Sequence, residues 1–278
     1  MNVKIQGFDK ISRSWTAGNT AGYAELEKIP FRIPIANGST GVTVDSVETI
    51  YDHERTGVNG IETLQDFVLC KGSLTSTWTP TAPGANGLCT TVLVYPAGTV
   101  PDGAEPYVTD DGFRAGSGGT TVGVFTWHRL AIPAGATWTL TWGAKLALGS
   151  HLYNGSALHM QIGAASVNGA AVTFGSKDVP IPVNAIIATE TDKKINGSDG
   201  PVPVSLGDRV RITIVAKAFG PAKASQTLVV TDTLPACLTF DGDDATVAGT
   251  PTVSGKNVTY TFSNVKNGTS VLAAFFAR

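Results

Sequence analysis

The stretch VVTDTLPACLTF, residues 229–240, decides the fold class of this chain. Its apolar first residues predict the end of a buried strand, and a turn containing Asp232 and Pro235 follows. An aspartate accepts backbone N–H bonds in such turns, and proline presets φ, so both residues favour a tight turn. Leu234 is expected to close the mouth of an apolar sandwich. Leu238 and Phe240 then alternate with polar residues, as in a strand that re-enters a core.

Two further stretches with alternating side chains lie on either side of this one. Residues 207–214, GDRVRITI, alternate valine and isoleucine with arginine and threonine, and residues 258–262, VTYTF, alternate apolar residues with threonine. Such alternation is typical of half-buried strands. Three strands of this kind, joined by turn residues, predict a small antiparallel β-sandwich.

The order of these pieces resembles a conserved repeat domain, of unknown function, found in large prokaryotic cell-surface proteins. That family carries a G-D-x-V-x-Y-x-I strand, then G-P-A, V-x-D-x-L-P-x-G-L-x-F and a closing V-T-Y-x-F. Residues 184–278 follow this order well, and residues 1–183 follow it more weakly, at 29–38 and 132–142. Cys237 stands where the family usually has glycine, and Ala218 where a strand-end asparagine is common. The resemblance implies immunoglobulin-like sandwiches, usually in tandem, outside the cell.

The composition also indicates an all-β chain with many turns. Only 15% of the 278 residues are charged, and there are 32 glycines and 15 prolines. This length allows one large or two ordinary domains. We predict two tandem immunoglobulin-like antiparallel β-sandwiches: a domain enlarged by long loops at residues 1–183 and a second domain at residues 184–278. Residues 179–183, VPIPV, are expected to form a stiff extended join between them.

Two segments of the first domain have no clear strand pattern. Residues 61–69 fit either a short helix or a strand. Residues 71–120 are rich in glycine, proline, serine and threonine, and we expect a long loop there with one short strand at residues 91–95. A loop of that length in a compact domain usually serves binding or assembly.

Charge and hydropathy exclude several classes of partner. The net charge is −2 and there is no basic run, so no nucleic-acid partner is expected. No apolar stretch approaches the roughly 18 residues needed to span a bilayer, so no membrane insertion is expected. The first residues, MNVKI, do not read as a signal peptide. We expect a mature or recombinant form of an extracellular, cell-surface protein.

Two of the three cysteines are candidates for a disulfide. Cys70 and Cys89 flank a segment rich in proline and glycine, and a bond between them would close a loop of about twenty residues. The alternative is two separately buried thiols. Cys237 is left over, and we predict a small buried residue at its turn.

Modification and metal binding each have candidates. Sequons of the form Asn-x-Ser/Thr fall at predicted turns or strand ends, where they would carry glycans or remain solvated turns. The acidic residues 241–244 and 110–111 could hold calcium, but neither run has the spacing of a calcium loop, so no cofactor is predicted and polar turns are favoured. The five candidate glycosylation sites are Asn37, Asn154, Asn196, Asn257 and Asn267.

Two segments are predicted to make contacts between subunits. In residues 27–38 two prolines lie on the face opposite four apolar residues, which predicts an edge strand or a strand that bends, because proline lacks a ladder donor. The apolar end of the chain, residues 270–278, predicts a strand that is paired within its own sheet or with a neighbouring subunit. The candidate assembly contacts are Ile29, Phe31, Ile33, Ile35, Val271, Phe275 and Phe276.

Catalytic motifs are weak and one binding motif remains open. The four histidines are scattered, and Ser117 in AGSGG lacks the strand–turn–helix context of a nucleophile elbow. No C-x-x-C motif for zinc or haem occurs. Trp138 and Trp142 share strand parity, which fits either a core stripe or a surface that stacks on sugar rings.

These observations lead to one expected function and one alternative. We expect a non-enzymatic extracellular structural protein, a subunit or segment of a prokaryotic filament, pilus or surface layer that assembles into a homopolymer by strand pairing and domain packing. The alternative is a carbohydrate-binding or adhesive module, which would use the tryptophan strand and residues 71–120 to bind surface glycans.

Overall fold

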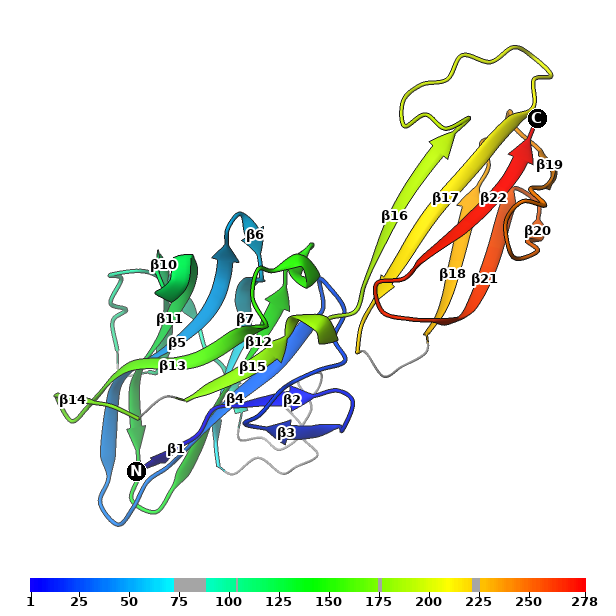
Figure 1. Ribbon diagram of the computed structural model, residues 1–278. Coiled ribbons are helices and arrows are strands. Elements are labelled where there is room, and N and C mark those ends of the chain that lie inside the picture. Colours follow the sequence, from blue (N-terminus) through cyan, green and yellow to red (C-terminus); the bar gives the residue numbers. More distant parts are fainter. Residues whose placement is uncertain (73–88, 104, 175–176, 222–225) are drawn as a thin grey trace. The chain divides into compact units, whose positions relative to one another are not determined.

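The computed structural model describes residues 1–72, 89–103, 105–174, 177–221 and 226–278. Almost all regular structure in these ranges is β-strand, arranged in several mostly antiparallel sheets, which confirms the all-β sandwich class (Figure 1). The chain divides into two compact units. The N-terminal unit is Met1–Ile186 and the C-terminal unit is Ile187–Arg278, so the division falls three residues after the expected position.

The N-terminal unit contains two large sheets. The first has the order β3-β2-β4-β12-β7-β8, with β1 also paired to β4. The second has the order β14-β13-β5-β11-β10-β9, with β15 paired to β13 and β6 to β5. The strands of the first sheet are β1 (Asn2–Val3), β2 (Gln6–Asp9), β3 (Ser14–Thr16), β4 (Lys28–Ala36), β7 (Ile61–Lys71), β8 (Cys89–Thr91) and β12 (Thr137–Leu146).

The second sheet has eight strands, and three short 3-10 turns lie in the connections before β11, before β13 and after β15. One ladder in it is parallel, that of β9 with β10. Its strands are β5 (Val42–Arg55), β6 (Val58–Asn59), β9 (Val94–Pro96), β10 (Tyr107–Ala115), β11 (Thr120–Ile132), β13 (Ala157–Val167), β14 (Ala170–Val172) and β15 (Asp178–Pro182), and the turns are η1 (Ser117–Gly119), η2 (Ser150–Leu152) and η3 (Val183–Ala185).

A single hydrophobic core fills the N-terminal unit. It takes the alternate residues of β4, β5 and β12, and Trp127 at its centre is completely buried. Trp127 packs edge-on against Phe67 at 5.4 Å between ring centroids and lies 6.2 Å from Trp142. Because strand side chains alternate between faces, the same strands leave polar residues on the outer faces of both sheets.

The C-terminal unit is a smaller sandwich of a four-stranded and a three-stranded sheet. The orders are β16-β17-β22-β19 and β18-β21-β20. Its core is built mainly from alternate residues of β17, β18, β21 and β22, with Tyr260 and Phe275 the largest fully buried side chains. The strands are β16 (Ala188–Ile195), β17 (Val210–Phe219), β18 (Gln226–Thr233), β19 (Phe240–Asp243), β20 (Thr252–Ser254), β21 (Asn257–Val265) and β22 (Ser270–Ala277).

The stretch 229–240 leads the chain from one sheet of this unit to the other. β18 ends at Thr233, and Leu234 is buried at the end of the sandwich, where its N–H donates to the Lys256 carbonyl at 2.8 Å. The Leu238 N–H closes the turn on the Pro235 carbonyl at 3.0 Å. The expected role of Asp232 is corrected, because its carboxylate accepts from Lys193 Nζ at 2.7 Å and so links the two sheets.

Of the two alternatives for residues 61–69, the strand is right, because residues 61–71 form β7. Three other expectations are corrected. Residues 178–182 form β15, which pairs with β13 inside the N-terminal unit and is therefore no linker. The 71–120 segment holds the nine-residue strand β10, although residues 73–88 and 104 lie outside the described residues. Cys237 is exposed, not buried.

Candidate functional site

The residues of β4 predicted to contact other subunits lie in the core. Ile29, Phe31, Ile33 and Ile35 are all at most 1% exposed. β4 pairs along its whole length with β12, and on its other side with two short strands, β2 at Arg32 and Phe31 and β1 at Ile35 and Ala36. The edge prediction is therefore wrong, because β4 has neighbouring strands on both sides. On the side away from β12 these are the short strands β2 and β1, and Pro34 lies between the residues that pair with them.

The terminal strand β22 is also interior. It pairs with β17 from Val210 to Lys217 and with β19 near its end, and Phe275 is fully buried. Val271 packs against the core, and the Arg209 guanidinium lies 3.8 Å from the ring centroid of the half-buried Phe276. The apolar run thus pairs within its own sheet, and the prediction that these side chains meet a neighbouring subunit is corrected for Phe275.

Among the described residues four strands of the C-terminal unit have one neighbour each: β16 and β19 at the ends of one sheet, and β18 and β20 at the ends of the other. The longest of these edge strands are β16 and β18, with eight residues each. The exposed residues of β16 include Asp192 and Lys193, and charges on an edge strand oppose pairing with another chain. The outward-facing residues of β18 are uncharged: Thr227, Val229, Thr231 and Thr233.

The two tryptophans considered for sugar stacking are core residues. Trp138 is 8% exposed and Trp142 is 2% exposed. Trp142 stacks on Phe31 at 6.1 Å, and Trp138 is covered by the Lys71 ammonium at 5.2 Å from its ring centroid. The hypothesis that this strand presents rings to a sugar is therefore wrong, and the core interpretation of their shared parity is right.

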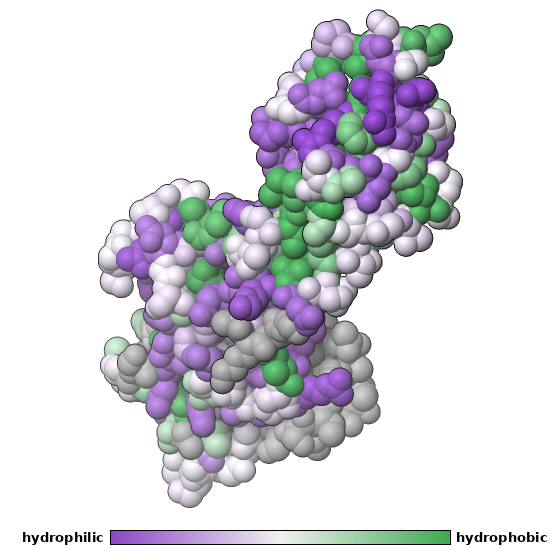
Figure 2. All heavy atoms as spheres, turned by 45° about the vertical axis from the view of Figure 1, so that its right-hand side comes forward, coloured by the Kyte–Doolittle hydropathy of each residue, from purple (hydrophilic) through white to green (hydrophobic). Residues whose placement is uncertain are grey.

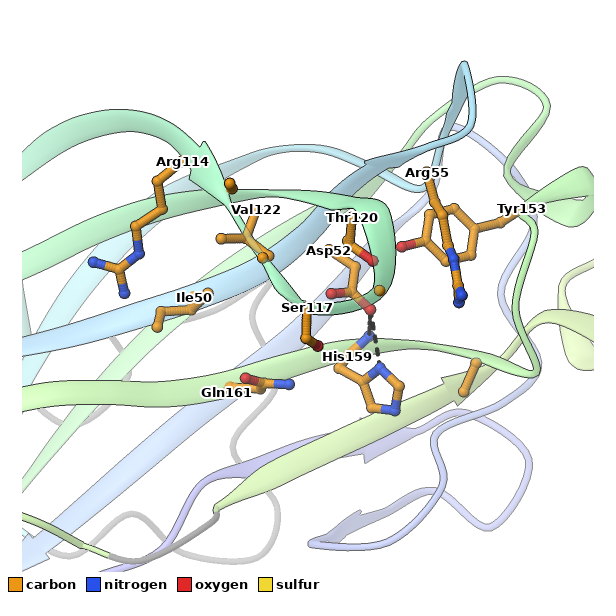
Figure 3. Close-up of a pocket in the computed structure, with 14 residues that line it drawn as sticks. Ile50, Asp52, Arg55, Arg114, Ser117, Thr120, Val122, Tyr153, His159 and Gln161 are labelled. Carbon is orange, nitrogen blue, oxygen red and sulfur yellow. Dashed lines mark hydrogen bonds and ion pairs between the residues drawn. The ribbon is translucent and has the colours of Figure 1, made fainter.

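A polar pocket of about 500 Å³ opens on the outer face of the longer sheet of the N-terminal unit. Figure 3 shows its walls: His159 and Gln161 extend from β13, and Ile50, Asp52 and Arg55 from β5. Other lining residues come from β10, β11, the η1 turn and the loop after η2. The labelled residues from those other elements are Arg114, Ser117, Thr120, Val122 and Tyr153.

His159 is fixed in the pocket by one carboxylate. Asp52 Oδ2 accepts from the His159 backbone N–H at 3.0 Å and lies 2.9 Å from its Nδ1. Because an ionised carboxylate only accepts, Nδ1 carries the proton and Nε2 is left for another partner. The hydrogen bond to Asp52 raises the pKa of His159 above its usual range, the nearby charge of Asp178 acts in the same direction, and burial opposes both.

The two arginines of the pocket differ in their partners. Arg114 makes a bidentate pair with Glu48, at 3.1 and 2.9 Å, so its charge is neutralised. No carboxylate within the described ranges pairs with the side chain of Arg55. Its guanidinium lies between Gly118 and Gly155, since a Cβ at these glycines would come within 3.5 and 3.3 Å of it. The pocket therefore holds one positive charge that the chain does not compensate.

Few sequence patterns point to this pocket. The AGSGG stretch around Ser117 lacks the context of a nucleophile elbow, and Figure 3 draws no bond between Ser117 and His159, whose marked partner is Asp52. His159 and Asp52 are 107 positions apart in the chain. They meet because β13 pairs with β5, with Met160 opposite Tyr51, and a strand pairing of this kind leaves no local sequence signal.

The five sequons differ in how far their amides are already used. Asn37 Nδ2 donates to the carbonyls of Ile132 and Pro133, at 2.9 and 3.0 Å, so that amide is committed to a turn. Asn154 Nδ2 donates to Thr56 Oγ1. In the other three asparagines the side-chain oxygen accepts a hydrogen bond. Asn196 accepts from the Arg211 N–H, Asn257 from the Thr233 hydroxyl, and Asn267 from the Gly220 N–H. Glycosylation remains a prediction, and these three fit it better than Asn37.

The acidic turn at 241–244 is satisfied by internal partners. Asp241 pairs with Arg209 and Arg278, and Asp243 lies 2.5 Å from the Tyr260 hydroxyl. Hydrogen bonds from Thr246 and then from Arg211 lower the pKa of Asp244 to about 2. Within the described residues no three His, Cys, Asp or Glu side chains gather as a metal site would require.

Cys70 and Cys89 form a disulfide across the β7–β8 ladder, where they are directly opposite each other. Replacing both with alanine is expected to lower the free energy of unfolding by about 3 kcal/mol, because the bond joins two residues that are 19 positions apart and so restricts the unfolded chain. Urea unfolding measures this loss. The exposed Cys237→Ala variant is the control and should change stability by less than about 0.5 kcal/mol. Equal stabilities of all three proteins would contradict the prediction.

Fold and surface together define an all-β sandwich protein with a polar pocket on one sheet and a free strand edge on another. No helix among the described residues is long and apolar enough to cross a membrane. No protein-family model matches the chain, and no curated protein is significantly similar to it. The resemblance to the prokaryotic surface repeat therefore stays a prediction.

Proposed function

We propose that this chain is a non-enzymatic structural protein of the prokaryotic cell surface, a subunit or segment of a filament, pilus or surface layer. Three features support the proposal. Residues 184–278 resemble the surface repeat, and nearly all regular structure is β-strand. The chain also has a disulfide, a bond that persists mainly in oxidising compartments outside the cytoplasm. Copies of the chain would join by strand pairing, giving a homopolymer.

The free edge of β18 is the observation that carries this mechanism. It offers eight residues whose backbone groups have one neighbouring strand, and Val229 at its middle is 56% exposed. Its one charged residue, Asp232, is held by Lys193. Long uncharged edges pair with other chains unless a charge, proline or bulge prevents it. The ladder of β18 with β21 has one irregularity, between Gln226 and Leu228, and is regular from Leu228 to Thr233. In Figure 2 the C-terminal unit is in the upper part of the picture. Hydrophilic residues cover much of the face shown, and the hydrophobic residues form separate groups on it.

A lysine at the middle of this edge tests the mechanism. Val229→Lys is expected to stop polymer growth, because burying the ammonium against a second strand would cost more than the pairing contributes. The side chain already faces solvent, so the fold should be preserved. Light scattering of the purified chain over a concentration series measures the particle mass.

Leu206→Lys is the matched control, since Leu206 is a fully exposed apolar residue outside any strand. We expect this variant to polymerise like the wild type. Polymers of normal mass from Val229→Lys would refute assembly through β18.

The second candidate is a carbohydrate-binding or adhesive surface module. The polar pocket on β5 and β13 favours it, because convergent polar groups in a hollow of this size are typical of small-ligand sites. The buried Trp138 and Trp142 cannot serve this role, so the pocket replaces them as the place to look for a ligand.

A further inference from the structure

We propose that the polar pocket binds an acidic sugar, with the carboxylate of a uronic acid held by Arg55. This rests on the second candidate function and is independent of polymerisation. The proposal starts from charge: among the basic side chains described in the pocket lining, Arg114 is neutralised by Glu48, His159 is paired with Asp52, and Arg55 has no carboxylate partner. One carboxylate of a ligand would complete this arrangement.

The ligand group follows from the shape of the arginine. A guanidinium presents parallel N–H groups that match the two oxygens of a carboxylate, and such pairs are stronger than neutral hydrogen bonds. Small residues leave this face of the side chain open, because Gly118 and Gly155 on either side have no Cβ to cover it. The carboxylate would therefore approach Arg55 from the pocket.

The remaining lining suits the hydroxyl groups of a sugar ring. Ser117 and Thr120 each provide a donor and acceptor, and Gln161 provides both through its amide. Figure 3 shows these groups around the hollow, with Arg55 and Tyr153 at one side and Arg114 at the other. The volume of about 500 Å³ lies within the usual range for small-molecule sites. The ring of Tyr153 is buried, so recognition by stacking has no exposed ring here.

The charge of His159 gives the site a pH dependence of known sign. Asp52 from β5 and Asp178 from β15 face this imidazole, and the two arginines and Tyr153 complete the charged or titratable lining. Burial raises the pKa of Tyr153, so that group stays neutral. The pKa of His159 is raised above its usual value, so the imidazolium persists to higher pH than that of an unperturbed histidine and is lost as the pH rises further. Affinity for an anion should fall as that positive charge disappears.

Calorimetric titration with two matched ligands tests the proposal on the full chain. The ligands are trigalacturonic acid and its methyl ester, which differ in charge and little in shape. We expect the acid to bind at least about tenfold more tightly than the ester, since only the acid forms the charge-assisted pair. Absence of binding by the acid, or equal affinities for acid and ester, would overturn the proposal.

Variants then locate the site. Arg55→Gln should weaken binding of the acid by about tenfold or more. The affinity of Arg55→Lys should lie between those of Arg55→Gln and the wild type, because lysine keeps the positive charge but cannot form the bidentate pair. Arg13→Gln, at an exposed arginine of the β2–β3 turn, should bind normally. Normal binding by a folded Arg55→Gln would overturn the proposal, as would inorganic phosphate binding as tightly as the acid with the same dependence on Arg55.

The pH series supplies a readout that a merely structural role of His159 would not change. Between about pH 6 and pH 9 the wild-type affinity for the acid should fall, and His159→Gln should bind equally across this range. A pH dependence that survives in the variant would contradict the assigned role. Titrating Val229→Lys as well separates the two proposals, because loss of assembly leaves this pocket on the other unit unaltered.

Discussion

Replacing Phe275 with alanine is expected to lower the free energy of unfolding of the C-terminal unit by about 3–5 kcal/mol. The side chain is fully buried in the core of that unit and lies 6.0 Å from the Phe240 ring, so truncation leaves a large cavity. Urea unfolding followed by circular dichroism measures the loss. All five tryptophans precede Ile187, so their fluorescence reports the N-terminal unit alone and helps separate the two records.

Leu272 provides the matched control on the same strand. It is 39% exposed, and Leu272→Ala should therefore cost well under half as much as Phe275→Ala. Similar losses from both variants would mean that β22 is not buried as described. The same geometry decides how assembly can be tested: deleting residues 270–278 would remove core, so a failure of that truncated chain to polymerise would only report unfolding.

Replacing Trp142 with alanine is expected to cost about 3–5 kcal/mol in the N-terminal unit and to leave sugar binding to the folded protein unchanged. Trp142 is 2% exposed and packs between Phe31 and Trp127, so it stabilises the sandwich and faces no ligand. Urea unfolding gives the stability, and titration with trigalacturonic acid below the unfolding range gives the binding.

Phe113→Ala is the aromatic control for this variant. Phe113 is 59% exposed and stacks on His53 at 4.1 Å, so its loss should cost about 1 kcal/mol. Loss of uronate binding in a Trp142→Ala protein that is still folded would contradict the placement of this tryptophan in the core.

The sequence was most informative where local pattern and packing agree. The alternation in residues 207–214 and 258–262 corresponds to β17 and β21. The turn predicted at Leu234 and Pro235 follows the end of β18 directly. The pairing of Cys70 with Cys89 was one of two alternatives, and the β7–β8 ladder that aligns them was not foreseen. Period-two patterns are strong signals because they come from one strand alone.

Predictions failed where the answer depended on which strands become neighbours. The prolines of β4 predict an edge, but two short strands, β1 and β2, pair with β4 on that side. The apolar run 271–276 fits pairing either within its own sheet or with another chain, and the structure pairs it within its own sheet. The pocket combines Arg55 of β5, Ser117 of η1 and His159 of β13, which only tertiary pairing brings together. Sequence periodicity states which face is buried, not what covers an edge.

Electron microscopy of the purified wild-type chain tests the central claim most directly. If the protein is a structural subunit that grows by pairing along β18, the images will show regular filaments or sheets, and Val229→Lys preparations under the same conditions will show separate particles. Dispersed single particles of the wild type at every concentration would contradict the account, and titration of the Arg55 pocket with acidic sugars would then take its place as the guide to function.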